Sequence, residues 1–444
     1  MKDGKSENKP ASVLETTKQA GEVRARWLWT EPTAWTERML TALEQGVKGG
    51  KWFSLIDKVC SRSVLLSAYQ SVKANRGSPG VDRQTIEMFE KRLDDNLTRL
   101  SDQLRKGTYR PQAIRRVYIP KPGSTEKRPL GIPTVRDRVV QSAIRAVIEP
   151  IFEWEFAERS YGFRPGRGCK DALRQVEALL KSGHIWVVDA DLKSYFDTIP
   201  HEPLMNEIKA RISDGKVLGM IEAYLKQEIL DWVKAWTPEE GAPQGAVLSP
   251  LLSNIYLDPL DQRMAARKVE MVRYADDFVL LCKSQEEALA ALRMVEEWTS
   301  ARGLKLHSEK THIVEVTQEG FDFLGYHFAK NTRWPRKKSL RKLKDTIRHK
   351  TKRTNGHSLE AIIDKVNQTT QGWFEYFKHS HFTTFRPLDG WIRMRLRSIL
   401  RKRNGGKGRG RGSDHQRWPN AYFAERGLFS LYTAYVEARQ SSMR

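Results

Sequence analysis

The stretch "MVRYADDFVLLC", residues 271–282, places two adjacent aspartates between two short apolar runs. In an unbroken strand, neighbouring side chains point to opposite faces, so one of the two carboxylates would be driven into a core. Burial of an unpaired charge is strongly unfavourable. A hairpin removes this conflict because its turn places Asp276 and Asp277 at an exposed tip. There both carboxylates can face a cation.

A second set of acids ends an apolar, β-branched run that begins at Ile185. The sequence "VVDADLKSYFD", residues 187–197, contains Asp189, Asp191 and Asp197. A carboxylate at this strand end could complete a site for Mg²⁺, which prefers oxygen ligands and keeps several waters. Two such ions, about 3.5–4 Å apart, can activate a 3′-hydroxyl and stabilise a leaving pyrophosphate. The alternative is that these acids only form turns and cap helices, and the Asp-Asp pair alone does not exclude it.

The composition indicates a basic, folded protein. Its 444 residues include 77 Lys/Arg and 54 Asp/Glu, which gives a formal net charge of +23. This charge favours a polyanionic partner, nucleic acid first, over a basic surface that contacts only solvent. The three widely spaced cysteines, Cys60, Cys169 and Cys282, fit a reducing cytoplasm and support neither a disulfide framework nor a Cys-based zinc site. The polar start "MKDGKSENKP" and the absence of long apolar runs predict no secretory signal and no membrane span.

Hydrophobic periodicity and turn residues predict the elements that carry these motifs. A long amphipathic helix is expected over about residues 83–106, and another over 286–303 that stops at Gly303. Strand pairs are expected within 115–133 and within 321–328.

The composition changes beyond Phe328. Residues 333–353 contain eleven Lys/Arg and one acid, so a helix there would carry cations on most faces, which suits phosphates better than a core. Residues 359–400 are expected to be helical. The Gly/Arg-rich stretch 401–418 is expected to be a flexible linker, followed by a short amphipathic helical segment.

Nine motifs follow one another along the chain. They are "NRGSPGVD" (75–82), "YRPQAIRRVYIPKPGSTEKRPLGIPTVRDRVVQ" (109–141), "SYGFRPGRGCKDAL" (160–173), "DADLKSYFDTIPH" (189–201), "GAPQGAVLSPLLSNIYLDPLD" (241–261), "RYADDFVL" (273–280), "GLKLHSEKT" (303–311), "FDFLGYHF" (321–328) and "GWFEYFKHS" (372–380). In this order they resemble the reverse transcriptases encoded by group II introns, also called maturases, over roughly residues 60–400.

The resemblance implies the fold and the domains. The fold class is an α/β right-hand polymerase, with fingers and palm built on a mainly antiparallel catalytic sheet and followed by an α-helical thumb. The expected divisions are a partly disordered N-terminal extension (1–58), fingers (59–175), palm (176–328), a basic helical thumb or maturase domain (329–400), and a basic linker with a short helical segment (401–444). The sequence leaves open whether the N-terminal extension binds RNA or packs.

The family pattern also selects among the acids. It implies that Asp191, Asp276 and Asp277 are the catalytic residues and hold two Mg²⁺ ions, while Asp189 and Asp197 are structural, with Asp197 placed to cap a helix. Phe196 matches an aromatic residue that packs under the sugar of the incoming nucleotide, where a ring leaves no room for a 2′-hydroxyl. The alternative for Phe196 is ordinary core packing.

Other positions match family residues that contact the incoming dNTP. Lys121 and Arg128 would neutralise the triphosphate, and the alternative is two solvated charges on a hairpin. Gln244 and Gly245 would approach the nucleotide or template, or else form a plain turn. Lys310 would assist departure of pyrophosphate, or else be a plain surface lysine.

Two groups of cations are predicted to bind nucleic acid. Arg159, Arg164 and Arg167 lie among aromatic and glycine residues, which suits template backbone and bases. The second group stands where the thumb should begin and comprises Arg336, Lys337, Lys338, Arg341 and Lys342. We do not expect a metal site at His379 and His381, because no further ligand is near them in the sequence.

The resemblance implies an RNA-directed DNA polymerase that also binds its intron RNA, promotes splicing and supports intron retromobility. The implied partners are intron RNA as template, primer and target DNA, and dNTPs, in the cytoplasm with the nucleoid or a ribonucleoprotein. Nothing after Leu400 resembles an HNH-type nuclease, so we expect no second-strand cleavage. Two alternatives stay open: a related reverse transcriptase recruited to phage defence or DNA repair, and a splicing factor with an inactive palm. The oligomeric state is not indicated by the sequence.

Overall fold

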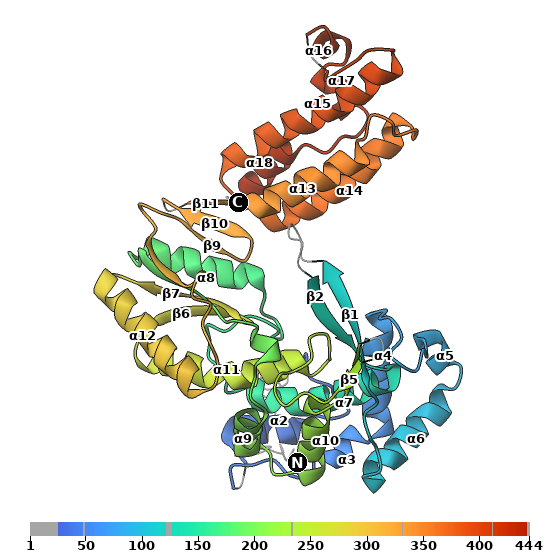
Figure 1. Ribbon diagram of the computed structural model, residues 1–444, viewed down its shortest axis with the longest axis vertical. Helices are drawn as coiled ribbons and strands as arrows, with labels where there is room; N and C mark the ends of the chain where they lie inside the picture. The colour runs from blue at the N-terminus through green and yellow to red at the C-terminus, as the bar shows by residue number, and fades with distance from the viewer. Residues whose placement is uncertain are drawn as a thin grey trace, which may run out of the picture. The chain divides into compact units, whose positions relative to one another are not determined.

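The computed structural model describes residues 25–47, 49–120, 127–231, 234–330, 332–410 and 412–441. These residues form two compact units (Figure 1). Of the described residues, those within 25–120, 127–176 and 190–312 belong to unit 1, and those within 177–189 and 313–441 belong to unit 2. The boundary crosses the stretch predicted to be the palm, and the predicted division into fingers, palm and thumb stays a prediction.

Unit 1 is rich in helices. They are α2 (Glu37–Gln45), α3 (Ile56–Val59), α4 (Arg62–Ala74), α5 (Ile86–Glu90), α6 (Leu93–Lys106), α7 (Val135–Glu153), the start of α8 (Cys169–Lys181), η1 (Tyr195–Asp197), α9 (His201–Arg211), α10 (Gly215–Leu225), α11 (Ser249–Ala266) and α12 (Gln285–Ala301). α12 confirms the predicted helix, and Gly303 follows it in a left-handed conformation with φ +73°.

The N-terminal segment packs on this unit from residue 25 onward. Trp35 is fully buried, and its Nε1 donates a hydrogen bond of 3.1 Å to the carbonyl oxygen of Ala146 in α7. Its ring meets the ring of Trp52 at a centroid distance of 5.3 Å. Residues 25–58 therefore contribute to the core of unit 1, whereas residues 1–24 of the predicted extension lie outside the described residues.

The single helix predicted over residues 83–106 is wrong, because the structure divides it into α5 and α6. Arg92 lies between them with non-helical angles, φ −128° and ψ 41°. The break lets Phe89 stack on Tyr69 while Leu97 is also fully buried. Asn96 Nδ2 donates to the carbonyl oxygen of Phe89 at 2.9 Å and stabilises the bend. Tertiary packing here outweighs helix propensity.

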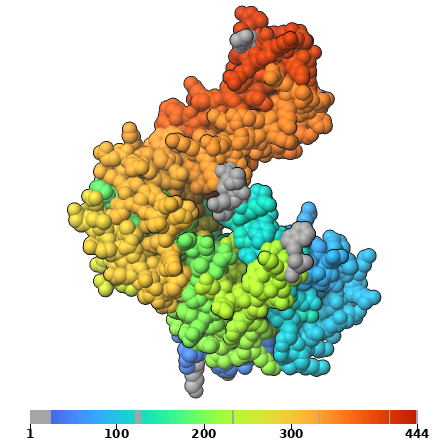
Figure 2. All heavy atoms as spheres, in the orientation of Figure 1, coloured from blue at the N-terminus to red at the C-terminus, as the bar shows by residue number. Residues whose placement is uncertain are grey.

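A four-stranded sheet in unit 1 has the order β2-β1-β4-β5. Its strands are β1 (Ile114–Pro120), β2 (Lys127–Ile132), β4 (Ile229–Asp231) and β5 (Lys234–Trp236). β1 pairs antiparallel with β2, with Ile119 opposite Arg128, which confirms the predicted strand pair. β1 also pairs parallel with β4, and Figure 2 shows the cyan hairpin beside the yellow-green atoms of this region.

A second four-stranded sheet has the order β6-β7-β3-β8. Its strands are β3 (Trp186–Asp191), β6 (Glu270–Tyr274), β7 (Asp277–Cys282) and β8 (His312–Glu315). β6 and β7 pair antiparallel, with Tyr274 opposite Asp277, so Ala275 and Asp276 form a two-residue turn. The predicted hairpin is confirmed, with Asp276 in its turn and Asp277 as the first residue of β7.

Unit 2 begins with a three-stranded antiparallel sheet of order β11-β10-β9. Its strands are β9 (Phe321–Phe323), β10 (Tyr326–Ala329) and β11 (Thr332–Pro335). The helices that follow are α13 (Lys337–Lys350), α14 (Leu359–Phe377), η2 (Phe382–Thr384), α15 (Phe385–Arg403), α16 (Asp414–Arg417), α17 (Asn420–Ala424) and α18 (Leu431–Ser441). No helix in the described ranges is long and apolar enough to cross a membrane.

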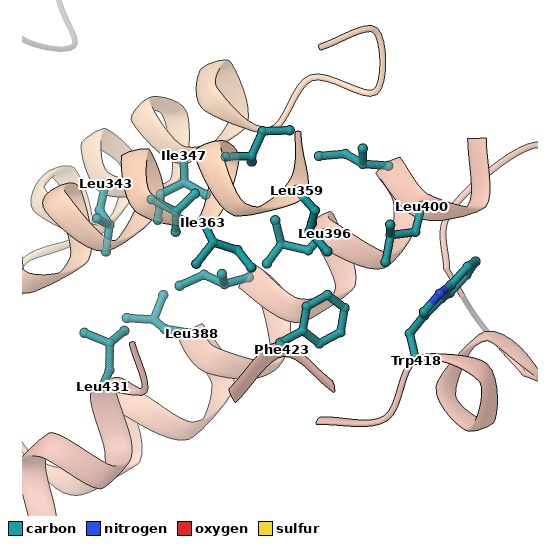
Figure 3. Packing of buried hydrophobic residues seen from close by; sticks show 14 of the residues in the cluster. Leu343, Ile347, Leu359, Ile363, Leu388, Leu396, Leu400, Trp418, Phe423 and Leu431 are labelled. Atoms are coloured by element: carbon teal, nitrogen blue, oxygen red, sulfur yellow. The ribbon is translucent and has the colours of Figure 1, made fainter. Parts of the chain in front are cut away.

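These helices share one apolar core (Figure 3). α13 packs on α14 and contributes Leu343 and Ile347 to a core that also contains residues of α14 and α15. The expectation that this basic helix would be a poor core element is therefore wrong, because its apolar residues are spaced by four and share one face. Trp418, Phe423 and Leu431 join the same core from the C-terminal segments, with Trp418 near Leu400 at one end and Leu431 near Leu388 at the other (Figure 3).

The Gly/Arg-rich stretch predicted as a flexible linker is folded against α15. Arg401 Nε donates to the carbonyl oxygen of Lys407 at 2.8 Å, and Arg353 Nη1 donates to that of Gly408 at 3.1 Å. Arg397 Nε donates to the carbonyl oxygen of Trp418 at 2.8 Å. Composition alone suggested disorder, but guanidinium groups satisfy the backbone carbonyls of the glycine-rich turns and hold them in place.

Candidate active site

The turn between β6 and β7 is strained and tightly enclosed. Ala275 has φ +61°, a left-handed conformation that L residues other than Gly adopt only at a cost. Gly162 lies directly against this turn, and a Cβ at position 162 would lie only 2.1 Å from the Ala275 backbone nitrogen. Because these two backbones approach so closely, position 162 requires glycine, and the position of the turn is constrained.

A buried arginine, Arg273 of β6, stabilises this turn. Arg273 is fully buried, and its guanidinium binds the Asp261 carboxylate through Nε at 2.8 and 2.9 Å. Its Nη1 donates to Asn254 Oδ1 and to the carbonyl oxygen of Ala275, each at 2.9 Å. Burial alone would lower the pKa of Arg273, but the Asp261 carboxylate raises it above its ordinary value. The charged side chain thus ties the turn to α11.

Sequence reasoning missed Arg273, Asp261 and Asn254. Asn254 adds a second tie, because its Nδ2 donates to the carbonyl oxygen of Gly162 at 2.8 Å. The position of Arg273 within an apolar strand could have indicated this network, because a buried arginine needs a buried acid as its partner.

Asp191 ends β3 and faces the same region of unit 1. Its Oδ2 accepts an ion-paired hydrogen bond of 2.5 Å from Lys310 Nζ. Its backbone oxygen accepts from the His307 amide at 2.8 Å, which fixes the loop that carries Lys310. The structure thus brings Lys310 to a predicted catalytic aspartate.

The aspartates differ in exposure. Asp277 is exposed, whereas Asp276 is half-buried rather than at a fully exposed tip. Burial raises the pKa of the Asp276 carboxyl, and the charge of Asp191 raises it further. Arg128 of β2 and Arg273 act in the opposite direction. Asp191 and Asp276 therefore repel each other across a partly desolvated space that Arg128 also reaches.

Phe196 lies in η1, next to Tyr195. The ring is half-buried and meets those of Tyr195 and Phe163 edge-on, at centroid distances of 5.6 and 6.5 Å. Tyr195 itself is buried and donates to the carbonyl oxygen of Ser253 at 2.8 Å, so Phe196 is the more accessible ring of the pair. The predicted cap at Asp197 is wrong, because α9 starts at His201 with Pro200 at its N-cap.

The loop with Gln244 and Gly245 is docked on β2. The Gly131 amide donates to the carbonyl oxygen of Gln244 at 2.6 Å. Gly245 has φ +100°, and a Cβ there would lie 2.5 Å from the carbonyl oxygen of Gly131. Gln141 Oε1 of α7 accepts from the Val247 amide at 2.8 Å. Gly245 is thus required by backbone approach, and it joins this loop to the strand that carries Arg128.

Comparison with known proteins identifies the fold that holds these groups. Residues 119–328 match the family described as "Reverse transcriptase (RNA-dependent DNA polymerase)", and residues 340–418 match the "Group II intron, maturase-specific domain". The chain is 34% identical over 389 residues to Protein YkfC of Escherichia coli (strain K12), across 77% of this chain and 95% of YkfC. It is 38% identical over 208 residues to the Group II intron-encoded protein LtrA of Lactococcus lactis subsp. cremoris, across 46% of this chain and 34% of LtrA.

The chain belongs to the group II intron-encoded reverse transcriptases. It therefore has a right-hand polymerase fold with a helical maturase domain, and it is an RNA-directed DNA polymerase by family. Among solved structures, a partial Cas6-RT-Cas1–Cas2 complex is similar at a TM-score of 0.36 and 27% identity, over 56% of this chain and 41% of that chain.

Reverse transcriptases use divalent cations, and the carboxylates of this reverse transcriptase fit one. Among the residues that the structure describes, no group of three His, Cys, Asp or Glu side chains lies close enough to hold a metal ion. Mg²⁺ needs only one or two carboxylates when substrate phosphates supply further ligands. The repulsion between Asp191 and half-buried Asp276 is the feature that a cation would relieve.

The arginines predicted to bind template near this site have different surroundings. Arg164 is buried, and its guanidinium binds Glu153 at 2.7–3.0 Å and the carbonyl oxygen of Ser160 at 2.9 Å. Its assignment to nucleic acid is therefore corrected to a structural one. Arg159 forms an ion pair with Glu270. Arg167 is half-buried, and its Cζ lies 5.9 Å from the centroid of the Tyr161 ring. The partner acids were not visible as partners in the sequence.

The predicted thumb cations lie on α13 of unit 2. Lys337, Lys338, Arg341 and Lys342 are exposed, on the opposite side of the helix from its buried Leu343 and Ile347. Arg336 is half-buried at the helix N-cap. Lys121, predicted to contact the triphosphate, lies outside the described residues.

We expect Arg273→Met to unfold or strongly destabilise the reverse transcriptase, because Asp261 would be left as an unpaired buried charge. The loss in free energy of unfolding should be about 3–5 kcal/mol, measured by chemical denaturation. The double variant Arg273→Met/Asp261→Leu should recover much of that stability but little DNA synthesis, because the carbonyl oxygen of Ala275 still lacks its donor. Recovery of full synthesis in the double variant would show that the turn does not need Arg273.

We expect Asp276→Asn to stabilise the fold at pH 7 in EDTA, and the gain to vanish in acid. A carboxyl whose pKa is raised by folding favours the folded state only when protonated, so the charged form costs stability at neutral pH. The difference from wild type should shrink as the pH falls through the raised pKa toward the ordinary value of 3.8. Thermal unfolding at several pH values measures it. The exposed Asp102→Asn should show no such trend, and a flat Asp276→Asn profile would contradict the burial effect.

Proposed function

We propose that this reverse transcriptase copies an intron RNA into DNA and that its maturase domain binds the same RNA and promotes its splicing, which supports intron retromobility. The observation that carries the polymerase role is the proximity of Asp191, at the end of β3, and Asp276, in the β6–β7 turn, in one partly desolvated site. The maturase match over residues 340–418 supports the RNA-binding role.

In the proposed site, Asp191, Asp276 and Asp277 hold two Mg²⁺ ions. When bound, these ions supply activation of the primer 3′-hydroxyl and charge stabilisation of the leaving pyrophosphate. Arg128, with Lys121, binds the triphosphate and offsets charge that builds on its oxygens. Lys310 assists departure of pyrophosphate, and its ion pair with Asp191 supports this role.

The remaining residues of the site position and select the nucleotide. The half-buried ring of Phe196 packs under the sugar and excludes a 2′-hydroxyl by steric contact. Gln244 contacts the nucleotide or template, and Gly245 holds that loop against β2. Arg159 and Arg167 contact the template from positions where each keeps a protein partner.

The chain is proposed to divide into fingers (59–175), palm (176–328) and thumb (329–400), with the exposed cations of α13 and Arg336 binding the RNA backbone. The partners are intron RNA, primer and target DNA, and dNTPs. Because the proposed partners are polyanions and the chain has a formal net charge of +23, we propose that the protein associates with the nucleoid or a ribonucleoprotein in the cytoplasm.

Primer extension on an RNA template tests the polymerase. With Mg²⁺ and dNTPs, wild type and Asp102→Asn should extend the primer, and Asp276→Asn should lose at least about 100-fold in rate because a metal ligand is removed. RNA binding by Asp276→Asn should stay within about twofold, since one neutralised acid removes no phosphate contact. Extension by Asp276→Asn at the wild-type rate would refute the metal assignment. Tight RNA binding without extension by wild type would favour a splicing factor with an inactive palm.

A second prediction concerns sugar selection. Phe196→Val should raise incorporation of rNTPs relative to dNTPs by at least about tenfold, because the smaller side chain opens space for a 2′-hydroxyl. Phe163→Val serves as the control, since its ring neighbours Phe196. The measurement is kcat/KM for dCTP and CTP on one template. An unchanged ratio in Phe196→Val, or an equal change in the control, would reject Phe196 as the selecting ring.

A further inference from the structure

Unit 2 contains a cavity that the polymerase site does not use. It has a volume of about 340 Å³ and is formed by the end of α8, strands β10 and β11, the turn after α14, and α18. This volume lies within the range of small-ligand sites and suits a single nucleotide. We call it the basic cavity.

The cavity wall is strongly positive. Among the described residues of the lining there is one carboxylate, Glu177, and there are four cations: Lys181, Arg333, Lys378 and Arg439. Glu177 is shared between Lys181 at 2.9 Å and Arg333 at 3.2 Å. A single acid cannot neutralise this set, so the cavity favours an anion.

Arg439 on α18 has no carboxylate among its described contacts. Its Nη1 donates to Tyr435 OH at 3.1 Å, and its Cζ lies 5.9 Å from that ring. Lys378 pairs with Glu375, whose side chain is mostly exposed and therefore screens it weakly. Both cations keep donors for a phosphate group.

The same cavity has aromatic walls. Tyr435 from α18 and His381 from the turn after α14 line it, and the His381 ring lies next to that of exposed Phe382, at a centroid distance of 4.3 Å and an interplanar angle of 46°. Rings beside cations are the arrangement that binds an unpaired base together with its phosphate.

We propose that the basic cavity binds one unpaired nucleotide of RNA, with its phosphate between Arg439 and Lys378 and its base against Tyr435 or His381. The inference rests on the proposed RNA-binding function and adds a specific site to it. It also gives α18, outside the residues that match the maturase domain, a role in binding.

The test compares two arginines that are matched in their tyrosine neighbour, although Arg426 Nε also lies 3.7 Å from Glu360 Oε1. Arg439 follows Tyr435 by four residues and covers its ring, and Arg426 follows Tyr422 by four residues and covers its ring at 3.6 Å, but outside the cavity lining. Arg439→Glu and Arg426→Glu change the net charge equally. The probe is a fluorescent single-stranded 12-nucleotide RNA, with binding measured by anisotropy over a range of salt.

We expect Arg439→Glu to weaken RNA binding about tenfold and to lower the slope of log K against log salt by about 0.7, the value of one lost single-strand contact. Arg426→Glu should stay within about twofold, as expected for loss of long-range attraction only. Lys181→Gln, a milder change at an exposed position, should weaken binding in the same direction, and it serves if Arg439→Glu does not fold. 4-Thiouridine RNA should crosslink to the peptide that contains Tyr435 or His381.

Three results would overturn the site. Equal losses in the two arginine variants would show general charge attraction, and wild-type binding in both Arg439→Glu and Lys181→Gln would show that the cavity is not used. Equal competition by a decaglutamate peptide would identify an acidic peptide as the ligand. In these cases the proposed function survives as long as wild type binds RNA and extends a primer. Absence of RNA binding by wild type would overturn both proposals.

Discussion

The ion pair between Arg273 and Asp261 is the contact on which the catalytic turn depends. A fully buried guanidinium inside a strand is unfavourable unless its donors are satisfied, and here a carboxylate, an amide oxygen and a backbone carbonyl satisfy them. One of these acceptors belongs to the strained residue Ala275. The ion pair thus anchors the turn to α11. This fixes the position of Asp276, which follows the strained residue Ala275.

The same region shows a conflict between folding and chemistry. Asp276 is partly desolvated and lies near a second carboxylate, so its charged form is disfavoured by the protein itself. Such an arrangement is expected where a protein must bind a cation and not merely remain folded. The rigid support from Arg273 and Asn254 keeps the two acids together despite their repulsion.

Local features could be predicted from the sequence where only one local structure avoids burying an unpaired charge. Paired aspartates inside an apolar strand required a turn, and the hairpin of β6 and β7 is that turn. Prediction failed where the deciding partner was distant in the chain. Arg164 lies among aromatic residues and glycines in the sequence, as a template-binding residue would. In the structure it is buried and forms an ion pair with Glu153. Nothing local to Phe89 indicated the break between α5 and α6, because the ring of Tyr69 lies in another helix.

The way in which the Gly/Arg-rich stretch is folded has a consequence for ionic strength. Arg353, Arg397 and Arg401 use donors on backbone carbonyls, which carry no net charge. Contacts to neutral acceptors are weakened little by salt, whereas contacts between cations and phosphates are weakened strongly. This end of the molecule can therefore keep its shape across salt concentrations that would release a polyanion from it. Arg401 also pairs with the Asp414 carboxylate, whereas the described contact of Arg353 is to a neutral acceptor and leaves its positive charge uncompensated.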